Sequence, residues 1–368
     1  MQQTTLLANK KAAKEELYNL HFIRAISTII IIIFHFYLIV DMVGIHEPLW
    51  PLFSKFGAIG VSYFLLLSGA VLFYHYQNIE IKPLGFYKKR MSNLLPYFWV
   101  VYIFFAILFF FTRDRPFFEL EIWRIIFSVI GLDGYLSSQI RTYYLVGEWF
   151  TGCIIIIYFI FPLLLKFYKK NRYLTLLFLV TLSYISISNN QYMQDHFMLW
   201  SKEFAWNPLV RLPEIATGGF IINLYMDKLI VNLRKSFSIA LVIFLAIITW
   251  AYFSFSYDNV DILGHIPFMA ASFILLMLTY DLFMRGKITN RIVKYLSKYS
   301  FVAFLFHHQI IYIVVGRINL QHHNGFEHAL LCVAICITSF ALARLVYGIG
   351  DMIKHVVFDK TLFKKTIK

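Results

Sequence analysis

The chain alternates long apolar runs with short polar segments, and the length of these runs predicts its secondary structure. A run of about 20 apolar residues can cross the hydrocarbon core of a bilayer as a helix. Backbone polar groups inside a bilayer must be satisfied within their own segment, so each run is expected to be helical. Ten such runs are predicted, approximately over residues 20–41, 57–76, 92–112, 144–165, 173–189, 208–225, 236–256, 264–283, 300–317 and 328–350. The predicted fold class is an all-α, polytopic integral membrane protein with about ten transmembrane helices.

The polar segments between these runs alternate in charge, and this predicts their side of the membrane. Lys and Arg gather in every second segment, for example in residues 82–90, 166–172 and 285–298. In the other segments, acids and histidines balance the few bases. Because cytoplasmic loops are enriched in Lys and Arg, both termini are predicted to be cytoplasmic.

No linker or repeat divides the chain, so residues 1–368 are predicted to form a single transmembrane domain. Residues 1–19 would be its cytoplasmic N-terminal segment, and residues 351–368 its basic cytoplasmic tail. Residues 113–143 are predicted to form a long extracytoplasmic loop, because they are the longest segment on the side with few bases. A loop of this length is a candidate lid over an outward-facing site.

The composition supports the membrane interpretation and argues against nucleic-acid binding. Apolar residues make up 60% of the chain, aromatic residues 19% and charged residues only 15%. The formal net charge is +14, but Lys and Arg fall in short clusters between apolar runs and form no basic domain or stripe. The three cysteines show no paired-thiol or zinc spacing, and His322, His323 and His328 are interpreted as a solvated turn. No metal ion is therefore predicted.

The first apolar run contains two ionisable residues, Arg24 and His35. Eleven residues correspond to three helical turns plus about 20°, so both side chains lie on one helix face, separated by about 16 Å along the axis. Arg24 alone could simply extend to the interface, and His35 could hydrogen-bond a neighbouring helix. An ionisable pair on one face inside the bilayer favours a functional role, and a neutral imidazole is suited to moving a proton.

Six stretches, in order, resemble the Acyltransferase 3 family of membrane-bound O-acyltransferases. They include the Arg, ten residues, His pattern of the first helix, a Ser-Gly helix and a basic turn before a Leu-Pro helix. The stretches are Leu20 to His35, Gly60 to Gly69, Phe86 to Tyr97, Glu148 to Pro162, Arg211 to Gly219 and Phe306 to Gln309. The resemblance covers residues 17 to 315. It implies transfer of an acyl group, usually acetyl, from cytoplasmic acyl-CoA to a hydroxyl of a cell-surface or lipid-linked polysaccharide, in the plasma membrane.

The resemblance also suggests which residues act on each substrate. His35 is expected to be the general base that accepts the proton of the attacking hydroxyl, with a covalent acyl-histidine as the rival role. Glu148 is expected to orient an imidazole or to bind sugar hydroxyls, although it could be an interfacial acid without a partner. On the donor side, Arg24 and the triplet Lys88, Lys89 and Arg90 are expected to neutralise the phosphates of coenzyme A, a role compatible with positive-inside topology.

Four further residues are candidates for substrate contact or support. Arg211 and Glu214 lie three apart on one helix turn, so they form either a local ion pair or substrate contacts. Ser68 stands beside Gly69, where a small residue usually serves close helix packing. His307 and His308 point in different directions on a helix, so at most one is expected to face the same cavity as His35, and His308 is preferred.

Two other functions fit some of these features. Buried Arg, His and Glu side chains are also typical of a proton-coupled transporter, although no matching pair of Gly- or Pro-broken segments appears in the two halves. A membrane sensor without catalysis would not need Arg24, His35 and Glu148 together. Nothing in the sequence indicates an oligomeric state.

Overall fold

The computed structural model describes residues 16–112, 120–197, 199–227, 235–254 and 262–359, and these residues contain helices and no strand. Each of the ten predicted runs overlaps one long helix. These helices are α2 (Tyr18–Met42), α4 (Phe56–Tyr76), α6 (Leu95–Thr112), α9 (Glu148–Lys170), α10 (Arg172–Ser188), α12 (Pro208–Met226), α13 (Lys235–Ser254), α14 (Ile262–Thr279), α15 (Lys287–Val315) and α16 (Gly325–Val357). The all-α prediction is confirmed.

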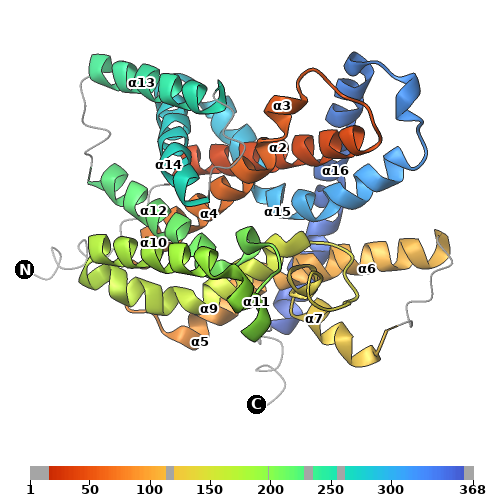
Figure 1. The fold of residues 1–368 in the computed structure, drawn as a ribbon, viewed down its shortest axis with the longest axis horizontal. Coiled ribbons are helices and arrows are strands. Elements are labelled where there is room, and N and C mark those ends of the chain that lie inside the picture. Colours follow the sequence, from red (N-terminus) through yellow and green to blue (C-terminus); the bar gives the residue numbers. More distant parts are fainter. Residues whose placement is uncertain (1–15, 113–119, 198, 228–234, 255–261, 360–368) are drawn as a thin grey trace, which may run out of the picture.

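Shorter elements connect the long helices. The α-helical ones are α3 (Trp50–Phe53), α5 (Pro83–Ser92), α7 (Ile125–Val129), α8 (Asp133–Leu136) and α11 (Asn190–His196). Three 3₁₀ turns and one π-helical turn complete the described residues: η1 (Ile122–Arg124), η2 (Phe204–Trp206), η4 (Leu320–His322) and the π turn η3 (Tyr280–Met284). Figure 1 shows α9 and α10 side by side, and α10 also packs against α12.

Seven helical segments are long and apolar enough to cross a membrane, and the bent pair α10 and α11, with an angle of 79°, would make an eighth. Among the described residues, α12 does not meet this criterion, and α13 contributes the shorter apolar stretch Ile239–Ile248. Most of α12 is buried inside the bundle, including Arg211 and Glu214, so its surface need not be apolar to suit lipid. The structure thus supports a multi-pass membrane protein, while the number of ten spans and the cytoplasmic termini stay predictions.

The predicted loops sort to opposite ends of the bundle. Contacts join the segments rich in Lys and Arg, or residues directly beside them, to one another. They are Lys294 to Glu16 (2.8 Å), Lys169 to the Ile79 carbonyl (2.7 Å) and Lys354 to Asn93 (2.5 Å). Other contacts join the segments with few bases to one another. They are His328 to Glu47 (2.5 Å), Tyr135 to the Leu199 carbonyl (2.8 Å) and Gln139 to the Trp200 carbonyl (2.6 Å). This separation is what an alternating topology requires.

The predicted terminal segments and long loop are only partly described. Residues 1–15, 113–119 and 360–368 lie outside the described residues, so the predictions for them stay open. Residues 120–143 fold into η1, α7 and α8, and they pack against the segment from Leu199 to Asn207 through the two Tyr135 hydroxyl contacts to Leu199 and Asn207. The loop is thus a folded element held to a second loop at the same end.

Helices α4 and α12 approach each other backbone to backbone through glycines. A Cβ atom added at Gly218 would lie 1.9 Å from the Leu66 carbonyl oxygen, and one added at Gly69 would lie 2.0 Å from the Ile215 carbonyl oxygen. Neither distance is possible for real atoms, so only glycine permits this packing. The close contact sets α4 against the buried helix that carries Arg211 and Glu214.

Candidate active site

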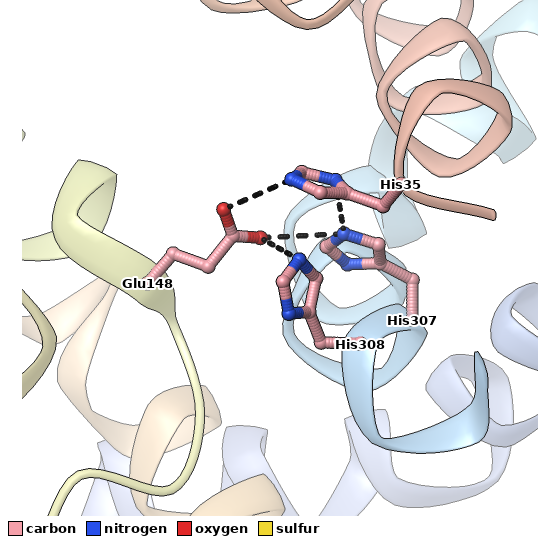
Figure 2. A group of neighbouring side chains, drawn as sticks. All are labelled: His35, Glu148, His307 and His308. Carbon is pink, nitrogen blue, oxygen red and sulfur yellow. Dashed lines mark hydrogen bonds and ion pairs between the residues drawn. The ribbon is translucent and has the colours of Figure 1, made fainter. Parts of the chain in front are cut away.

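Four ionisable side chains from three helices meet inside the bundle (Figure 2). His35 comes from α2, Glu148 from the first turn of α9, and His307 and His308 from α15. The Glu148 carboxylate lies 3.5 Å from Nε2 of His35 and 3.3 Å from Nε2 of both His307 and His308. We call these four residues the His/Glu cluster. It brings together both residues predicted to be catalytic, on helices that are far apart in sequence.

Backbone carbonyls define how the imidazoles of His35 and His307 are protonated. Nδ1 of His35 lies 3.1 Å from the Ile31 carbonyl oxygen, and Nδ1 of His307 contacts the Phe304 carbonyl oxygen. A carbonyl oxygen only accepts, so each Nδ1 carries a proton and donates it. His35 turns its other nitrogen, Nε2, toward Glu148 at the centre of the cluster. A carboxylate oxygen only accepts, so this contact becomes favourable when Nε2 gains a proton, as the nitrogen of a general base does. Nδ1 of His35 also lies 3.0 Å from Nε2 of His307, so the two rings contact each other directly.

The backbone at the start of α9 is unusual and places Glu148 at the centre of the cluster. Gly147 has φ +87° and Glu148 has φ +45°, in the left-handed region that non-glycine residues seldom adopt. Glu148 is the one non-glycine residue with a positive φ among the described residues. Strained backbone of this kind costs of order 1–3 kcal/mol and is found where function fixes a side chain. The carboxylate is thus held in place by the fold.

A second layer of side chains supports the start of α9. Trp149 follows Glu148 and stacks on Trp206, with ring centroids 5.6 Å apart. The guanidinium of Arg211 lies 5.7 Å from the centre of the Trp149 ring, and its Nη1 lies 3.2 Å from the Glu214 carboxylate. Of the two alternatives considered for Arg211 and Glu214, the local ion pair is present, and it is buried. Arg211 thus contacts the residue that follows Glu148, and neither Arg211 nor Glu214 belongs to the cluster.

A basic cavity of about 810 Å³ lies on the side of the cluster towards the basic loops, which is the side predicted to be cytoplasmic. Its lining contains several Lys and Arg side chains against a single carboxylate, that of Asp351. The bases are Arg24, Lys89, Arg90, Arg291, Lys294, Lys298 and Lys354. Such a concentration of one charge attracts a polyanionic ligand.

The cavity separates the predicted donor-side residues into two groups. Arg24, Lys89 and Arg90 line it, whereas Lys88 is exposed and does not. Ser68 also lines the cavity. Its place in the wall gives it a role in shaping the cavity, next to the glycine contact between α4 and α12.

Two features of the site were not apparent from the sequence. The expectation that at most one of His307 and His308 faces the same cavity as His35 is wrong. The centroids of the two rings lie 4.9 Å and 4.2 Å from that of His35, and both rings contact Glu148. The basic wall from α15, formed by Arg291, Lys294 and Lys298, was interpreted only as a cytoplasmic loop. Their spacing of three and four residues on one helix face was a signal that could have indicated it.

The four cluster residues could also hold a metal ion. One ligand atom from each lies within 4.8 Å of the others, and imidazole with carboxylate is a donor set that Zn²⁺ accepts. The same four residues also make sense as a hydrogen-bonded network without a metal ion, because the Nδ1 atoms of His35 and His307 contact backbone carbonyl oxygens. The absence of a metal ion stays a prediction, which metal analysis of the purified protein would test.

A bundle of apolar helices with a His/Glu cluster beside a basic cavity is an arrangement compatible with a membrane enzyme. A family model described as an acyltransferase domain matches residues 17–348, nearly the whole chain. The chain therefore belongs to the Acyltransferase 3 family, whose members are acyltransferases, generally of glycans. No curated protein and no solved structure matches the chain.

Proposed function

We propose that this acyltransferase moves an acyl group, acetyl in particular, from cytoplasmic acyl-CoA to a hydroxyl of a cell-surface or lipid-linked polysaccharide in the plasma membrane. The observation that carries the proposal is the position of His35. Its Nε2 lies 3.5 Å from the Glu148 carboxylate inside the bundle, and Arg24 on the same helix lines the basic cavity. One helix therefore connects a polyanion-binding cavity with a general base.

The reaction needs one proton acceptor and no redox step. The acceptor oxygen attacks the thioester carbonyl carbon while Nε2 of His35 takes its proton. The carbon–sulfur bond then breaks, an ester forms, and the thiolate of coenzyme A recovers the proton from the imidazolium. Glu148 lies 3.5 Å from Nε2 of His35, so its negative charge stabilises the imidazolium while the proton is held.

The donor would bind in the basic cavity through its phosphates. Coenzyme A carries a pyrophosphate and a 3′-phosphate, and Arg and Lys side chains bind phosphate through charge-assisted hydrogen bonds. Lys89 and Arg90 from α5 face Lys294 and Lys298 from α15 across the same cavity. Two basic walls suit a ligand with phosphates at several positions.

Turnover of labelled acetyl-CoA by the purified protein in detergent tests the proposal. We expect wild type to release coenzyme A and His35→Ala to lose at least about 100-fold in rate, because loss of a general base has this effect. His46→Ala is the control, since His46 is exposed, pairs with Asp41 and lies outside the cluster. If the variant His35→Ala keeps more than about a tenth of the rate, His35 is not the base.

The same measurement separates an enzyme from a proton-coupled transporter. A carrier would also use a buried cluster of titratable side chains, and the His/Glu cluster is the observation that favours this second candidate. A carrier leaves acetyl-CoA intact. Failure of wild type to turn over any acyl-CoA, together with proton-dependent solute uptake into vesicles, would support the transporter and refute the acyltransfer proposal.

A further inference from the structure

Three phenylalanine rings lie between the basic cavity and the His/Glu cluster. Phe64 belongs to α4, Phe150 to α9 and Phe304 to α15. The ring centroids are 5.6 Å apart for Phe64 and Phe150, 5.8 Å for Phe150 and Phe304, and 6.3 Å for Phe64 and Phe304. All three distances are typical of aromatic rings in contact, so each of the three rings packs against the other two.

The order of residues along the three helices places these rings at the inner end of the cavity. On each helix the lining residues recur about once per turn and end at the phenylalanine. The series are Val71, Ser68 and Phe64 on α4, Tyr158, Ile154 and Phe150 on α9, and Lys298, Phe301 and Phe304 on α15. None of the four cluster side chains, all within the described residues, lines the cavity.

The cluster begins directly beyond the rings. His307 follows Phe304 by three residues on α15, and Glu148 precedes Phe150 by two residues on α9, which correspond to about 3–5 Å along the helix axes. The centroids of the Phe304 and His307 rings are 5.4 Å apart. Phe150 and Phe304 are buried, and Phe64 is half-buried because it faces the cavity. The three rings thus separate the cavity from the cluster by one layer of side chains.

This arrangement limits what can reach His35. A thioester held in the cavity can meet Nε2 of His35 only if its acyl end passes the contact between the rings. The acyl group enters between the rings first, so the length of its chain determines how far the rings must move apart. We propose, resting on the acyltransfer function proposed above, that Phe64, Phe150 and Phe304 form an aromatic gate that admits short acyl chains and excludes longer ones.

The gate is tested by the ratio of rates with two donors. Inside-out membrane vesicles are prepared from cells that naturally carry the gene. These vesicles contain both the protein and its acceptor, and they expose the cytoplasmic face of the membrane to the added acyl-CoA. The measured quantity is label transferred to vesicle carbohydrate from hexanoyl-CoA, divided by that from acetyl-CoA. We expect Phe304→Ala and Phe150→Ala to raise this ratio at least about 10-fold over wild type, because single methylene differences in a fitted apolar site are worth about 10–200-fold.

Phe306→Ala is the matched control. Phe306 is a buried phenylalanine two residues from Phe304 on α15, but its ring packs against Phe104 and Phe105 on α6 and does not line the cavity. Its loss removes a similar apolar area and should leave the ratio within about 2-fold of wild type. Because both rates come from one preparation, the ratio does not depend on how much protein is folded. Phe304→Leu provides a conservative second variant with an intermediate ratio.

The outcomes distinguish the gate from the enzyme. If wild type uses hexanoyl-CoA as well as acetyl-CoA, or if Phe304→Ala and Phe306→Ala give the same ratio, the gate is refuted while acyltransfer stands. If vesicles with and without the gene show no difference in turnover of any acyl-CoA, the proposed function is refuted and the gate with it. A raised ratio in Phe150→Ala and Phe304→Ala, with Phe306→Ala unchanged, supports both.

Discussion

At the scale of single residues, Lys88 and Lys89 show how a step of one residue along a helix changes what a side chain can contact. Both belong to the basic turn that resembles the family pattern, and the sequence alone treats them alike. Both side chains are exposed in α5, but Lys89 lines the basic cavity and Lys88 does not. Adjacent residues on a helix differ by about 100° in direction, so only Lys89 is placed for the proposed donor binding, while membrane topology suffices to explain Lys88.

This pair gives a test of the donor site. Lys89→Ala is expected to raise the KM for acetyl-CoA about 10-fold, because a charge-assisted hydrogen bond is worth about 1.5–3 kcal/mol. Lys88→Ala should change the same KM by less than about 2-fold. The measurement is initial rate against acetyl-CoA concentration for both variants. Equal effects of the two substitutions would show that the donor does not occupy the cavity.

Asp133 is a buried acid outside the membrane-spanning helices. It begins α8, its Oδ1 accepts a hydrogen bond from the Gly134 amide, and burial raises the pKa of its carboxyl from 3.8 to about 7. The folded protein therefore binds a proton that the unfolded chain releases at lower pH. By linkage, this group favours the folded state below about pH 4, and that contribution falls as the pH rises to about 7.

Asp133→Asn isolates this effect, because asparagine keeps the acceptor for Gly134 and has no charge. We expect the melting temperature of wild type, relative to Asp133→Asn, to fall between about pH 4 and pH 7 and to level off above that range. Thermal unfolding of both proteins in the same detergent at several pH values measures the difference. A difference that stays constant with pH would mean that the Asp133 carboxyl has the same pKa in the folded and the unfolded protein.

At the scale of helices, the bundle depends on the contact between α4 and α12. Gly218→Ala would place a methyl group 1.9 Å from the Leu66 carbonyl oxygen, so the two helices must move apart. We expect a loss of at least about 1–3 kcal/mol in the free energy of unfolding, as for overpacked cores. Gly348→Ala on α16 is the control, because a Cβ there meets nothing within 4 Å.

Both substitutions replace glycine by alanine within a helix, so their difference in helix propensity is the same and favours alanine. Thermal unfolding in detergent should therefore show Gly218→Ala below wild type and Gly348→Ala at or above it. Displacement of α12 would also disturb the Arg211 and Trp149 contact that supports Glu148, so activity should fall together with stability. If Gly218→Ala unfolds like wild type, the two backbones do not approach as closely as described.

At the scale of the whole molecule, the number of membrane spans remains to be tested, and α12 decides it. Arg141, Asp227 and Lys287 are exposed, and each can be replaced by cysteine in a background without Cys153, Cys332 and Cys336. With ten spans, Asp227→Cys and Lys287→Cys lie in the cytoplasm and Arg141→Cys lies outside. A membrane-impermeant thiol reagent added to intact cells should then label Arg141→Cys alone.

Labelling of Asp227→Cys from outside would mean that α12 does not cross the membrane, and the number of spans would fall. Labelling of Lys287→Cys from outside would invert the bundle and place the basic cavity on the wrong side for a cytoplasmic donor. Because α12 extends over 19 residues, or about 28 Å, it is long enough to cross. Its charged pair is buried against other helices, which removes the main cost of such a crossing.

The sequence by itself determined the elements of this protein. Runs of apolar residues fixed ten helices, because a backbone in lipid has no other way to satisfy its polar groups. Helical periodicity also placed Arg24 and His35 on one face of α2, and it indicated the ion pair of Arg211 and Glu214. All of these inferences concern residues within one helix, where spacing alone fixes relative direction.

The tertiary structure decided what lies between helices. That His307 and His308 both reach Glu148 depends on how α15 is rotated against α9, and that Phe64, Phe150 and Phe304 meet depends on three helices at once. The apolar pattern of a helix does not determine how it is rotated against its neighbours, because many pairings of apolar helix faces bury a similar area. Shape alone selects among them, through contacts such as Gly69 against Ile215 that no single helix specifies.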